Sequence, residues 1–281
     1  MKPKASIIVP AYNAEKFISE TLKSVRKQTV PLSDFELILI NDGSTDNTSE
    51  IIEREIFGMN NFLFLNRDKN LGQAASTNQG INSSSGKYII LLDADDLLEP
   101  NAVESTLRFM ERNPRVEYSY SRHRRIDEKG NFLENRPGYS FSLERLFHFN
   151  FVGHLKCFSR EIHDRLGGFN EEIIYAQDWE HVLSASEILR KGQISQNSEY
   201  LYLYRFYQGN SSTVKNEERK LFVSRFLTEH LAKRKIGANV FWSHMTKDKY
   251  NYFDWKLKKS ENVNSFFGEE ILKERDLAGE E

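Results

Sequence analysis

The segment Tyr88-Ile89-Ile90-Leu91-Leu92-Asp93-Ala94-Asp95-Asp96 runs from an apolar stretch directly into three acids within four residues. The apolar part has the length of a strand and no alternation with polar side chains, which indicates a strand buried on both faces. Residues two apart on an extended chain point the same way, so Asp93 and Asp95 can face one point. Close carboxylates raise one another's pKa unless a cation neutralises them, and oxygen ligands favour Mg²⁺ or Mn²⁺. The structural alternative is a solvated acidic turn with Asp96 capping the next helix, but the position after a buried strand favours a metal site.

Working outward, similar apolar runs alternate with helical patterns through the first half of the chain. Strands separated by helices imply right-handed crossovers, so we expect an α/β fold with a mostly parallel mixed sheet flanked by helices. Ligands in such sheets bind at the carboxyl ends of the strands. Asn13 is expected to cap the first helix, and Thr45 or Asp46 the second. The expected strands are 5–10, 35–40, 62–65, 88–92 and 116–121.

The alternation weakens after about residue 120. A turn signal at 127–131 predicts the tip of a hairpin, and the aromatic run 200–207 is strand-like. From residue 216 onward the pattern is helical and highly charged, with Leu221, Phe222, Phe226, Leu227 and Leu231 on one face. We therefore expect one domain over 1–213, made of two halves (1–100 and 101–213), followed by a C-terminal helical extension over 214–281.

Composition excludes several classes of protein. The 281 residues carry 39 Lys plus Arg and 41 Asp plus Glu, and a net charge of −2 argues against a non-specific polyanion binder or a nucleic-acid partner. No apolar run approaches the ~18 residues of a membrane-spanning helix. Cys157 is the single cysteine, which excludes an intrachain disulfide and fits a reducing cytoplasm.

Three further segments follow expected strands or lie between them. Asp42, in Asn41-Asp42-Gly43-Ser44-Thr45-Asp46, can accept hydrogen bonds from a base or a ribose, or can belong to a plain Asp-Gly turn. Tyr12, in Pro10-Ala11-Tyr12-Asn13, can stack on a nucleobase, or the segment is only a strand-to-helix turn. Arg67, Lys69 and the backbone near Gly72 can meet phosphate or base, and a solvated loop is the alternative.

Taken together and in this order, the motifs 10–13, 41–46, 70–72 (Asn70-Leu71-Gly72) and 92–96 resemble the nucleotide-binding half of family 2 glycosyltransferases, which have the Rossmann-like GT-A fold. Each motif alone is weak, but four of them in register over the first hundred residues are highly specific. The resemblance implies a nucleotide-diphospho-sugar donor, with a UDP-sugar favoured, and a Mn²⁺ or Mg²⁺ ion that bridges its diphosphate.

The resemblance also implies roles for individual residues on the donor side. Asp42 would hold the base or ribose, Asp93 would help to hold the ribose or sugar, and Asp95 would ligate the metal with Asp96 beside it. The predicted donor-binding residues are Pro10, Tyr12, Asp42, Asn70, Gly72, Asp93, Ala94, Asp95 and Arg205.

On the acceptor side, the segments 167–172 and Ala176-Gln177-Asp178-Trp179-Glu180 resemble the motif that supplies the catalytic base of an inverting enzyme. Asp178 is the predicted base, although Gln177 stands where the family usually has Glu. The alternative is that Asp178 caps a helix, and a helix N-terminus would lower its pKa and weaken it as a base. Glu180 is the fallback base. Trp179 and His154 are predicted acceptor contacts, although a lone histidine in an apolar setting is more often structural.

A late segment, Tyr204-Arg205-Phe206-Tyr207, resembles a family motif in which Tyr-Arg is followed by His and then Ser. Arg205 can bind the diphosphate bidentately, and a salt bridge to a nearby acid is the alternative. Tyr207 occupies the position where His is expected, so metal coordination would be less complete or would use water.

The sequence lacks the Gln-x-x-Arg-Trp signature of processive polysaccharide synthases, which favours a single transfer to a carbohydrate or lipid-linked acceptor in glycan synthesis. The rival functions are a nucleotidyltransferase and a catalytically inactive sugar-binding module of the same fold; dinucleotide and P-loop motifs are absent. Aromatic residues among lysines over 241–255 suggest peripheral contact with the inner face of a membrane, with a small helical core as the alternative. A homodimer through the C-terminal helices is a further option.

Overall fold

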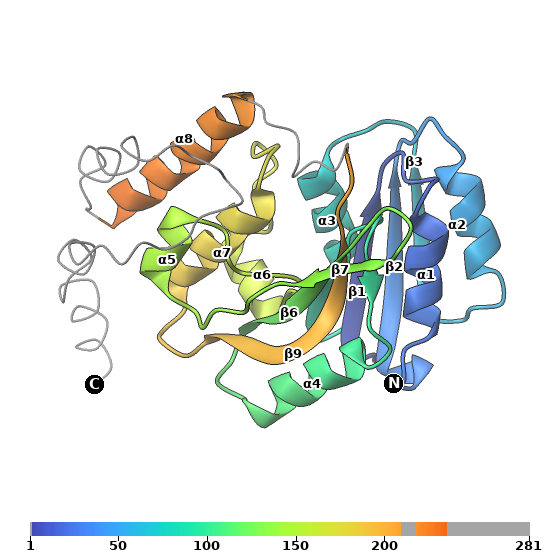
Figure 1. The fold of residues 1–281 in the computed structure, drawn as a ribbon, viewed down its shortest axis with the longest axis horizontal. Coiled ribbons are helices and arrows are strands. Elements are labelled where there is room, and N and C mark those ends of the chain that lie inside the picture. The colour runs from blue at the N-terminus through green and yellow to red at the C-terminus, as the bar shows by residue number, and fades with distance from the viewer. Residues whose placement is uncertain (1, 209–216, 235–281) are drawn as a thin grey trace.

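The computed structural model describes residues 2–208 and 217–234, in which strands and helices follow one another as Figure 1 shows. A strand is present at each of the expected positions 5–10, 35–40, 62–65, 88–92 and 116–121, although the fourth ends at Leu91 and the fifth begins at Tyr118. The strands are β1 (Ala5–Ala11), β2 (Phe35–Asp42), β3 (Phe62–Arg67), β4 (Tyr88–Leu91), β5 (Leu97–Leu98), β6 (Tyr118–Ile126), β7 (Phe132–Asn135), β8 (Cys157–Ser159) and β9 (Ile194–Arg205). The helices are α1 (Ile18–Arg26), α2 (Thr48–Ile56), α3 (Gln73–Asn82), α4 (Ala102–Arg112), α5 (Leu143–His148), α6 (Arg160–Leu166), α7 (Gln177–Ile188) and α8 (Glu217–Lys233), with a 3-10 turn η1 at Leu32–Asp34.

The described strands form one nine-stranded sheet in the order β3-β2-β1-β4-β8-β6-β9-β5, with β7 beside β6. From β3 to β4 the pairs are parallel, as the alternation of strands and helices predicts. Beyond β4 the sheet is mixed, because β8 runs antiparallel to both β4 and β6 while β9 runs parallel to β6. The predicted α/β fold with a mixed sheet is therefore confirmed, and the mixing begins where the first half of the chain meets the second.

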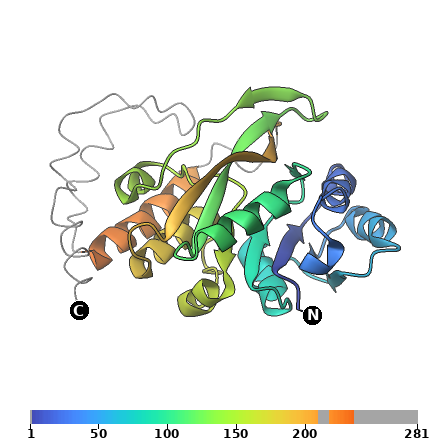
Figure 2. The same cartoon turned by 90° about the horizontal axis from the view of Figure 1, so that it is seen from below.

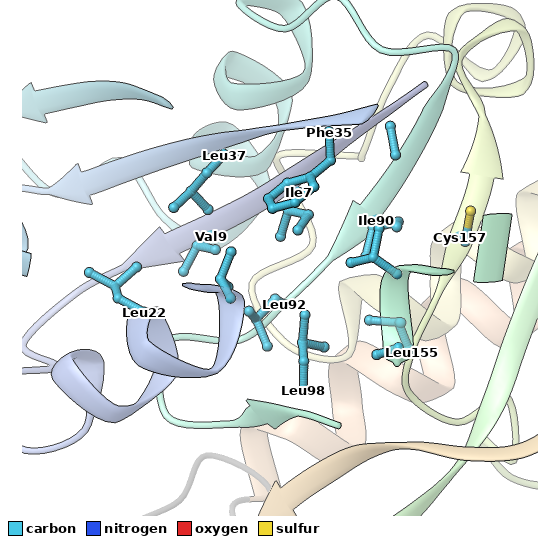
Figure 3. Packing of buried hydrophobic residues seen from close by; sticks show 14 of the residues in the cluster. Ile7, Val9, Leu22, Phe35, Leu37, Ile90, Leu92, Leu98, Leu155 and Cys157 are labelled. Atoms are coloured by element: carbon cyan, nitrogen blue, oxygen red, sulfur yellow. The ribbon is translucent and has the colours of Figure 1, made fainter. Parts of the chain in front are cut away.

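Helices cover both faces of the sheet, which is why its central strands are apolar throughout. Ile7 and Val9 of β1 point to the face covered by α1, where Leu22 packs on them, as Figure 3 shows. Ile8, between them, points to the other face with Ile81 of α3. Each such side chain is fully buried, which stabilises the fold by ~1.5–3 kcal/mol per residue.

The parallel strands bring the predicted donor motifs to one edge of the sheet. Ala11 at the end of β1 lies opposite Asn41 near the end of β2, and Ile8 lies opposite Leu91 at the end of β4. The residues that follow these strands therefore leave the sheet side by side, although they are up to 80 positions apart in the chain.

The turn after β1 differs from the sequence-based expectation. Asn13 was predicted to cap the first helix, but α1 begins at Ile18, and Asn13 has a left-handed backbone with φ 47°. Its side chain instead accepts a hydrogen bond from the backbone N–H of Thr45 at 2.8 Å. The cap predicted at Thr45 or Asp46 is also not at the cap position, because Asn47 precedes α2 and makes no side-chain cap. The Asp46 carboxylate nevertheless accepts from the N–H of Thr48, in the first turn, at 3.0 Å.

Helix α8 packs on α7, near the end of the described chain (Figures 1 and 2). Phe226, Leu227 and Leu231 of the predicted apolar face are buried in one cluster with Val182 and Leu183 of α7. The side chains of Leu221 and Phe222, the other two members of that face, lie outside the described residues. The boundary predicted at residue 213 and the aromatic segment 241–255 lie outside the described residues. Within the described residues, none of the helices is both long and apolar enough to span a bilayer.

Candidate active site

The loops after β1 and β2 are held together by hydrogen bonds between their polar residues. The N–H of Asn13 donates to Ser44 Oγ at 2.9 Å, and the N–H of Ala14 donates to Thr48 Oγ1 at 2.8 Å. The Tyr12 side chain is half exposed at this edge. The stacking role predicted for Tyr12 has accessible surface and stays a prediction, as does donor binding by Pro10, which lies near the end of β1.

Asp42 is buried and its two oxygens are occupied by the protein. Oδ1 accepts from Arg67 Nη1 at 2.9 Å and from the N–H of Leu71 at 3.0 Å, and Oδ2 accepts from the N–H of Gly72 at 2.9 Å. Asn70 Oδ1 accepts from the same N–H at 2.9 Å. In this structure Asp42 therefore shapes the loop 70–72 that opens α3, and its predicted contact with base or ribose stays a prediction.

The Asp-Gly turn after β2 passes very close to this loop. Gly43 has φ +68°, and a Cβ at that position would lie 2.5 Å from the carbonyl carbon of Lys69. Since any side chain would meet backbone there, only glycine allows the second and third donor motifs to approach each other this closely.

Asp93, the first acid after β4, faces the edge where these loops meet and is half-buried. Its Oδ1 accepts from Gln73 Nε2 at 3.2 Å, and its N–H donates to the hydroxyl of Tyr202 at 3.1 Å. Burial and the nearby charge of Asp95 raise the pKa of Asp93 to about 7, although the Lys156 ammonium opposes the shift. This carboxylate is short of compensating positive charge.

Asp96 is fully buried, and its Oδ1 accepts from the backbone N–H of Arg205 at 2.7 Å. Burial, followed by the charges of Asp95 and Asp93, raises the pKa of Asp96 well above its usual value. Its Oδ2 is buried without a partner in good hydrogen-bond geometry, although the Tyr202 hydroxyl is near enough to offset part of the rise. A cation would relieve this charge and supply the missing partner.

One set of ligand atoms in the described residues fits such a cation. One atom each of Asp93, Asp96 and His154 lie within 4.8 Å of one another. Two carboxylates and an imidazole suit Mn²⁺, and the carboxylates also suit Mg²⁺. Asp96 was a predicted ligand. Asp95, the other predicted ligand, instead accepts a hydrogen bond from Tyr207 Oη at 3.1 Å, and burial raises its pKa.

Arg205 was predicted to bind diphosphate, and the structure gives it protein partners. It is fully buried, and its guanidinium donates to the carbonyl oxygens of Asp95 and Glu128, both at 2.8 Å, and to Glu20 Oε2 at 2.7 Å. These contacts match the salt bridge that the sequence offered as the alternative. In this arrangement Arg205 locks the end of β9 to the acidic loop.

His154 lies between aromatic rings and the acids. Its ring stacks on Tyr202 and Tyr204 at centroid distances of 4.7 and 5.3 Å, and its Nδ1 lies 3.9 Å from Asp93 Oδ2. Burial, aided by the charges of Lys156 and His123, lowers the pKa of His154 well below its usual value. The neutral imidazole has a lone pair for a metal or a hydroxyl.

Asp178 lies in the first turn of α7 and is paired with a buried cation. Its Oδ2 accepts from Lys156 Nζ and from Asn150 Nδ2, both at 2.9 Å. Burial alone would raise the pKa of Asp178, but the charge and hydrogen bond of Lys156, with His154 and Asn150, lower it to about 2. The alternative role as helix cap is not observed, because Ala176 precedes α7 without a side-chain cap. Lys156 thus favours the ionised form of Asp178, which lies near the acid cluster formed by Asp93, Asp95 and Asp96.

The unexpected Gln177 links the two halves of the site. Its Nε2 donates to Gln73 Oε1 at 2.9 Å, and Gln73 in turn donates to Asp93. Ionised Asp93 can only accept, so Gln73 turns its amide nitrogen to Asp93 and its amide oxygen to Gln177. A glutamate at position 177 could not donate, so this bridge is specific to an amide there.

Trp179 and Glu180, which were also predicted on the acceptor side, do not lie at the acid cluster. Trp179 is almost completely buried, and its indole N–H donates to the carbonyl of Leu146 at 2.8 Å. Glu180, the fallback base, lies 3.5 Å from His230 Nε2 on the side of α7 that faces α8. Trp179 therefore packs in the core in this structure, and Asp178 is the acid of this motif that meets the donor residues.

Sequence reasoning did not single out Lys156, Gln73 or Tyr202. Lys156 lies in an apolar run before Cys157, where a charge is unusual in a strand-like segment, and that was an available signal. Gln73 lies in a helical pattern and Tyr202 in an aromatic strand, and neither pattern marks the residue as part of a site. Only the position of β9 next to the loop that follows β4 brings Tyr202 to Asp93.

Comparison with known sequences gives consistent matches. Residues 6–169 match the family model described as Glycosyl transferase family 2. A chondroitin synthase of Pasteurella multocida strain Pm70 is 30% identical over 275 residues, which is 96% of this chain and 27% of the relative. A hyaluronan synthase of Pasteurella multocida is 33% identical over 76% of this chain and 21% of its own length. The chain thus spans about a quarter of the length of these curated relatives.

Solved structures share the architecture. TarS of S. aureus, residues 1–349 in complex with UDP-GlcNAc, superposes with a TM-score of 0.71 at 21% identity, covering 95% of this chain and 79% of that one. The mannosyltransferase PcManGT from Pyrobaculum calidifontis, in complex with GDP-Man and Mn²⁺, gives a TM-score of 0.61 at 18% identity, covering 89% and 66%. At these identities the likeness concerns the fold. Because the family model covers more than half of the chain and the sheet agrees, the chain belongs to glycosyltransferase family 2 and has its GT-A fold.

Proposed function

We propose that this chain is an inverting, metal-dependent glycosyltransferase that moves a sugar from a nucleotide-diphospho-sugar, with a UDP-sugar favoured, to a carbohydrate or lipid-linked acceptor. The observation that carries the proposal is the meeting of Asp93 and Asp178 from opposite halves of the chain. Hydrogen bonds through Gln73 link Asp93 to Gln177, the residue before Asp178. TarS is known with UDP-GlcNAc and PcManGT with GDP-Man, which supports a nucleotide sugar as donor.

On the donor side, Tyr12 and the loops around Asp42 and Gly72 hold the nucleoside end of the donor, and Asp93 holds its ribose or sugar. Asp93, Asp96 and His154 provide one ligand set for a divalent cation, and Asp95 with Asp96 is the set that the sequence predicts. A bound Mn²⁺ or Mg²⁺ would stabilise the charge of the leaving diphosphate. The Mn²⁺ in the PcManGT complex supports a metal in this role.

On the acceptor side, Asp178 is ionised and lies on the acceptor side of the acid cluster. The acceptor hydroxyl attacks the anomeric carbon, its proton passes to Asp178, and the bond from that carbon to the diphosphate oxygen breaks with its electron pair. Attack opposite the leaving group inverts the anomeric configuration. Since Lys156 depresses the basicity of Asp178, the proton transfer accompanies bond formation rather than preceding it.

The acceptor class rests on the relatives. Chondroitin and hyaluronan synthases of Pasteurella multocida support a role in polysaccharide or glycoconjugate synthesis. A cytoplasmic location, peripheral contact with the inner face of a membrane and a homodimer stay predictions from the sequence.

The test combines donor binding with product analysis. The purified chain is heated with UDP-, GDP- and dTDP-sugars in the presence of Mn²⁺, Mg²⁺ or EDTA, and donor at about 100 times its Kd should stabilise it by ~2.7 kcal/mol. We expect stabilisation by a UDP-sugar only with metal, and release of nucleoside diphosphate on transfer. Release of pyrophosphate would identify a nucleotidyltransferase instead, and donor binding without any transfer would favour the inactive sugar-binding module.

Variants separate the roles. Asp178→Asn should keep the donor-dependent stabilisation and lose transfer by about 10²-fold or more, as for other general bases. Asp95→Ala and His154→Ala distinguish the two ligand sets, because only the variant that removes a true ligand should abolish the metal-dependent shift. Normal transfer by the Asp178→Asn variant would mean that the base lies elsewhere.

A further inference from the structure

Two arginines beside the proposed acceptor side share a single carboxylate as their ion-pair partner. Arg125 of β6 and Arg136, just after β7, both donate through Nη1 to the same oxygen, Glu134 Oε1, at 2.9 and 3.2 Å. Among the residues that the structure describes, no other carboxylate lies within ion-pair distance of either guanidinium. Two positive charges therefore converge on one negative charge, which itself is half exposed.

The crowding of these charges is unfavourable without an anion. The Arg125 side chain is only 16% exposed, and burial together with the charge of Arg136 lowers its pKa. Its Nε is buried without a hydrogen-bond partner. Arg136 is more open, with 30% of its side chain exposed, so its guanidinium can reach a ligand from solution. A second acidic group would balance the pair, and the protein supplies none within ion-pair distance in the described residues.

The position of the pair connects it to the candidate active site. The N–H of Arg136 donates to the carbonyl of His123 at 3.0 Å. The His123 ring meets His154 edge to face at a centroid distance of 5.7 Å, and His154 lies beside Asp93. Contacts through His123 and His154 thus connect the arginine pair to the proposed point of transfer, on the side formed by the second half of the chain.

An aromatic surface accompanies the charges. The guanidinium of Arg125 lies 4.8 Å from the centroid of the Phe206 ring, and Phe206 is 37% exposed. An exposed aromatic face suits the apolar C–H face of a sugar ring, and a guanidinium fork matches a carboxylate or a phosphate. An aromatic ring beside two guanidiniums therefore suits an acidic saccharide.

We propose that Arg125 and Arg136 form an anion subsite that binds a carboxylate or phosphate on the acceptor glycan, next to the unit that receives the sugar. This subsite rests on the proposed function, because only a glycosyltransferase has an acceptor, and it specifies that the acceptor is an acidic glycan. Glu134 competes with the anion for the two guanidiniums and therefore limits the affinity of the subsite.

Binding is tested without catalysis, by titration calorimetry on the full chain at low salt. The three probes are an oligosaccharide that contains glucuronic acid, its carboxyl-reduced counterpart, which is the neutral probe, and an oligosaccharide whose one charged group is a terminal phosphate. At least one acidic probe should bind roughly tenfold or more tightly than the carboxyl-reduced one, with a difference that shrinks in salt. The acidic probe that binds identifies the group as carboxylate or phosphate. Equal binding of all three probes would overturn the proposal.

Two substitutions of opposite sign make the test specific. Arg136→Gln should weaken the acidic probe about tenfold and leave the neutral probe unchanged, whereas Glu134→Gln, which removes the competitor, should tighten the acidic probe. Arg112→Gln, at an exposed position at the end of α4, removes an equal charge elsewhere and should change neither. Unchanged affinity in Arg136→Gln, or weaker affinity in Glu134→Gln, would contradict the subsite.

The outcomes also separate this proposal from the function on which it rests. Transfer to neutral and acidic acceptors with equal KM would refute the subsite and keep the glycosyltransferase. Arg136-dependent binding of an acidic saccharide by a chain that transfers no sugar would refute the activity and keep the subsite.

Discussion

Asp93 shows how much a single carboxylate depends on its neighbours. Its side chain is held by Gln73, its N–H by Tyr202, and its charge is opposed by Asp95 and Asp178 and favoured by Lys156. None of these five contacts lies within the Asp93 motif except Asp95. The pKa of Asp93 therefore depends on burial and on Asp95 of its own motif, and then on residues from other elements.

Gln177→Glu is expected to impair donor binding. A glutamate cannot donate to Gln73, so the amide of Gln73 would turn toward the new carboxylate and leave Asp93 without its donor. The substitution also adds a negative charge beside Asp93 and Asp178. We expect the donor KM to rise about tenfold, since a hydrogen bond to a charged group is worth ~1.5–3 kcal/mol.

Steady-state kinetics that separate donor KM from kcat would check this expectation. Gln73→Ala should act in the same direction, and the double variant should be less than additive because both residues act through one bridge. An unchanged or lower donor KM in Gln177→Glu would show that the bridge does not position Asp93.

At the scale of elements, α7 has two functional faces. Its first turn presents Gln177 and Asp178 to the acid cluster, while Glu180 and Glu187 face α8. The α8 side is held by His230, which lies between these two glutamates. The docking of α8 therefore bears on the helix that carries the proposed base.

The stability contributed by the contact between α7 and α8 should depend on pH. Burial alone would lower the pKa of His230, but Glu180 and Glu187 raise it above the usual value, and Arg234 shares Glu187. A group whose pKa is raised on folding contributes stability that is full below its unfolded pKa of about 6.5 and is lost as pH rises through the folded pKa. Wild type should exceed His230→Gln in free energy of unfolding by on the order of 1 kcal/mol more at pH 6 than at pH 8.5.

Urea unfolding of both proteins at the two pH values measures this difference. The comparison must be between proteins, because burial lowers the pKa values of His123, His163 and His181, and these groups favour the folded state as pH rises. A wild-type advantage that is constant between pH 6 and 8.5 would exclude the charged His230.

For the whole molecule, the site lies where the parallel half of the sheet meets the mixed half. Asp93 leaves β4, His154 and Lys156 precede β8, and Tyr202 lies on β9. The end of β9 then returns to the first half of the chain through Arg205, which contacts Glu20 after the start of α1 and Asp95 after β4. One buried guanidinium thus joins three parts of the fold.

Arg205→Met is expected to lower stability more than donor affinity. Removing the guanidinium leaves buried carbonyls without donors and should cost ~3 kcal/mol or more. For a protein of this size that corresponds to a fall in Tm of roughly 6–12 °C. Thermal unfolding without donor, followed by donor titration at a temperature where the variant is folded, distinguishes the two roles. A normal Tm with weakened donor binding would instead restore Arg205 as the diphosphate ligand that its motif suggests.

The sequence by itself determined the parallel half of the sheet and the edge where the site forms. Buried strands such as 88–92 are readable because their apolar runs are local, and Asp93, Asp95 and Asp42 follow directly from strand ends. It also identified the hairpin tip at 127–131 and the family. These features depend on neighbours in the chain, which periodicity and motif order report.

The tertiary structure alone decided which side chains share the site. Strands of two and three residues, β5 and β8, carry no periodic signal, yet β8 reverses direction beside β4 and brings Lys156 to Asp178. The same packing buries Trp179 and Arg205, whose residue types had suggested ligand contacts. Long-range pairing sets burial and charge environment, and neither is encoded in the spacing of residues along the chain.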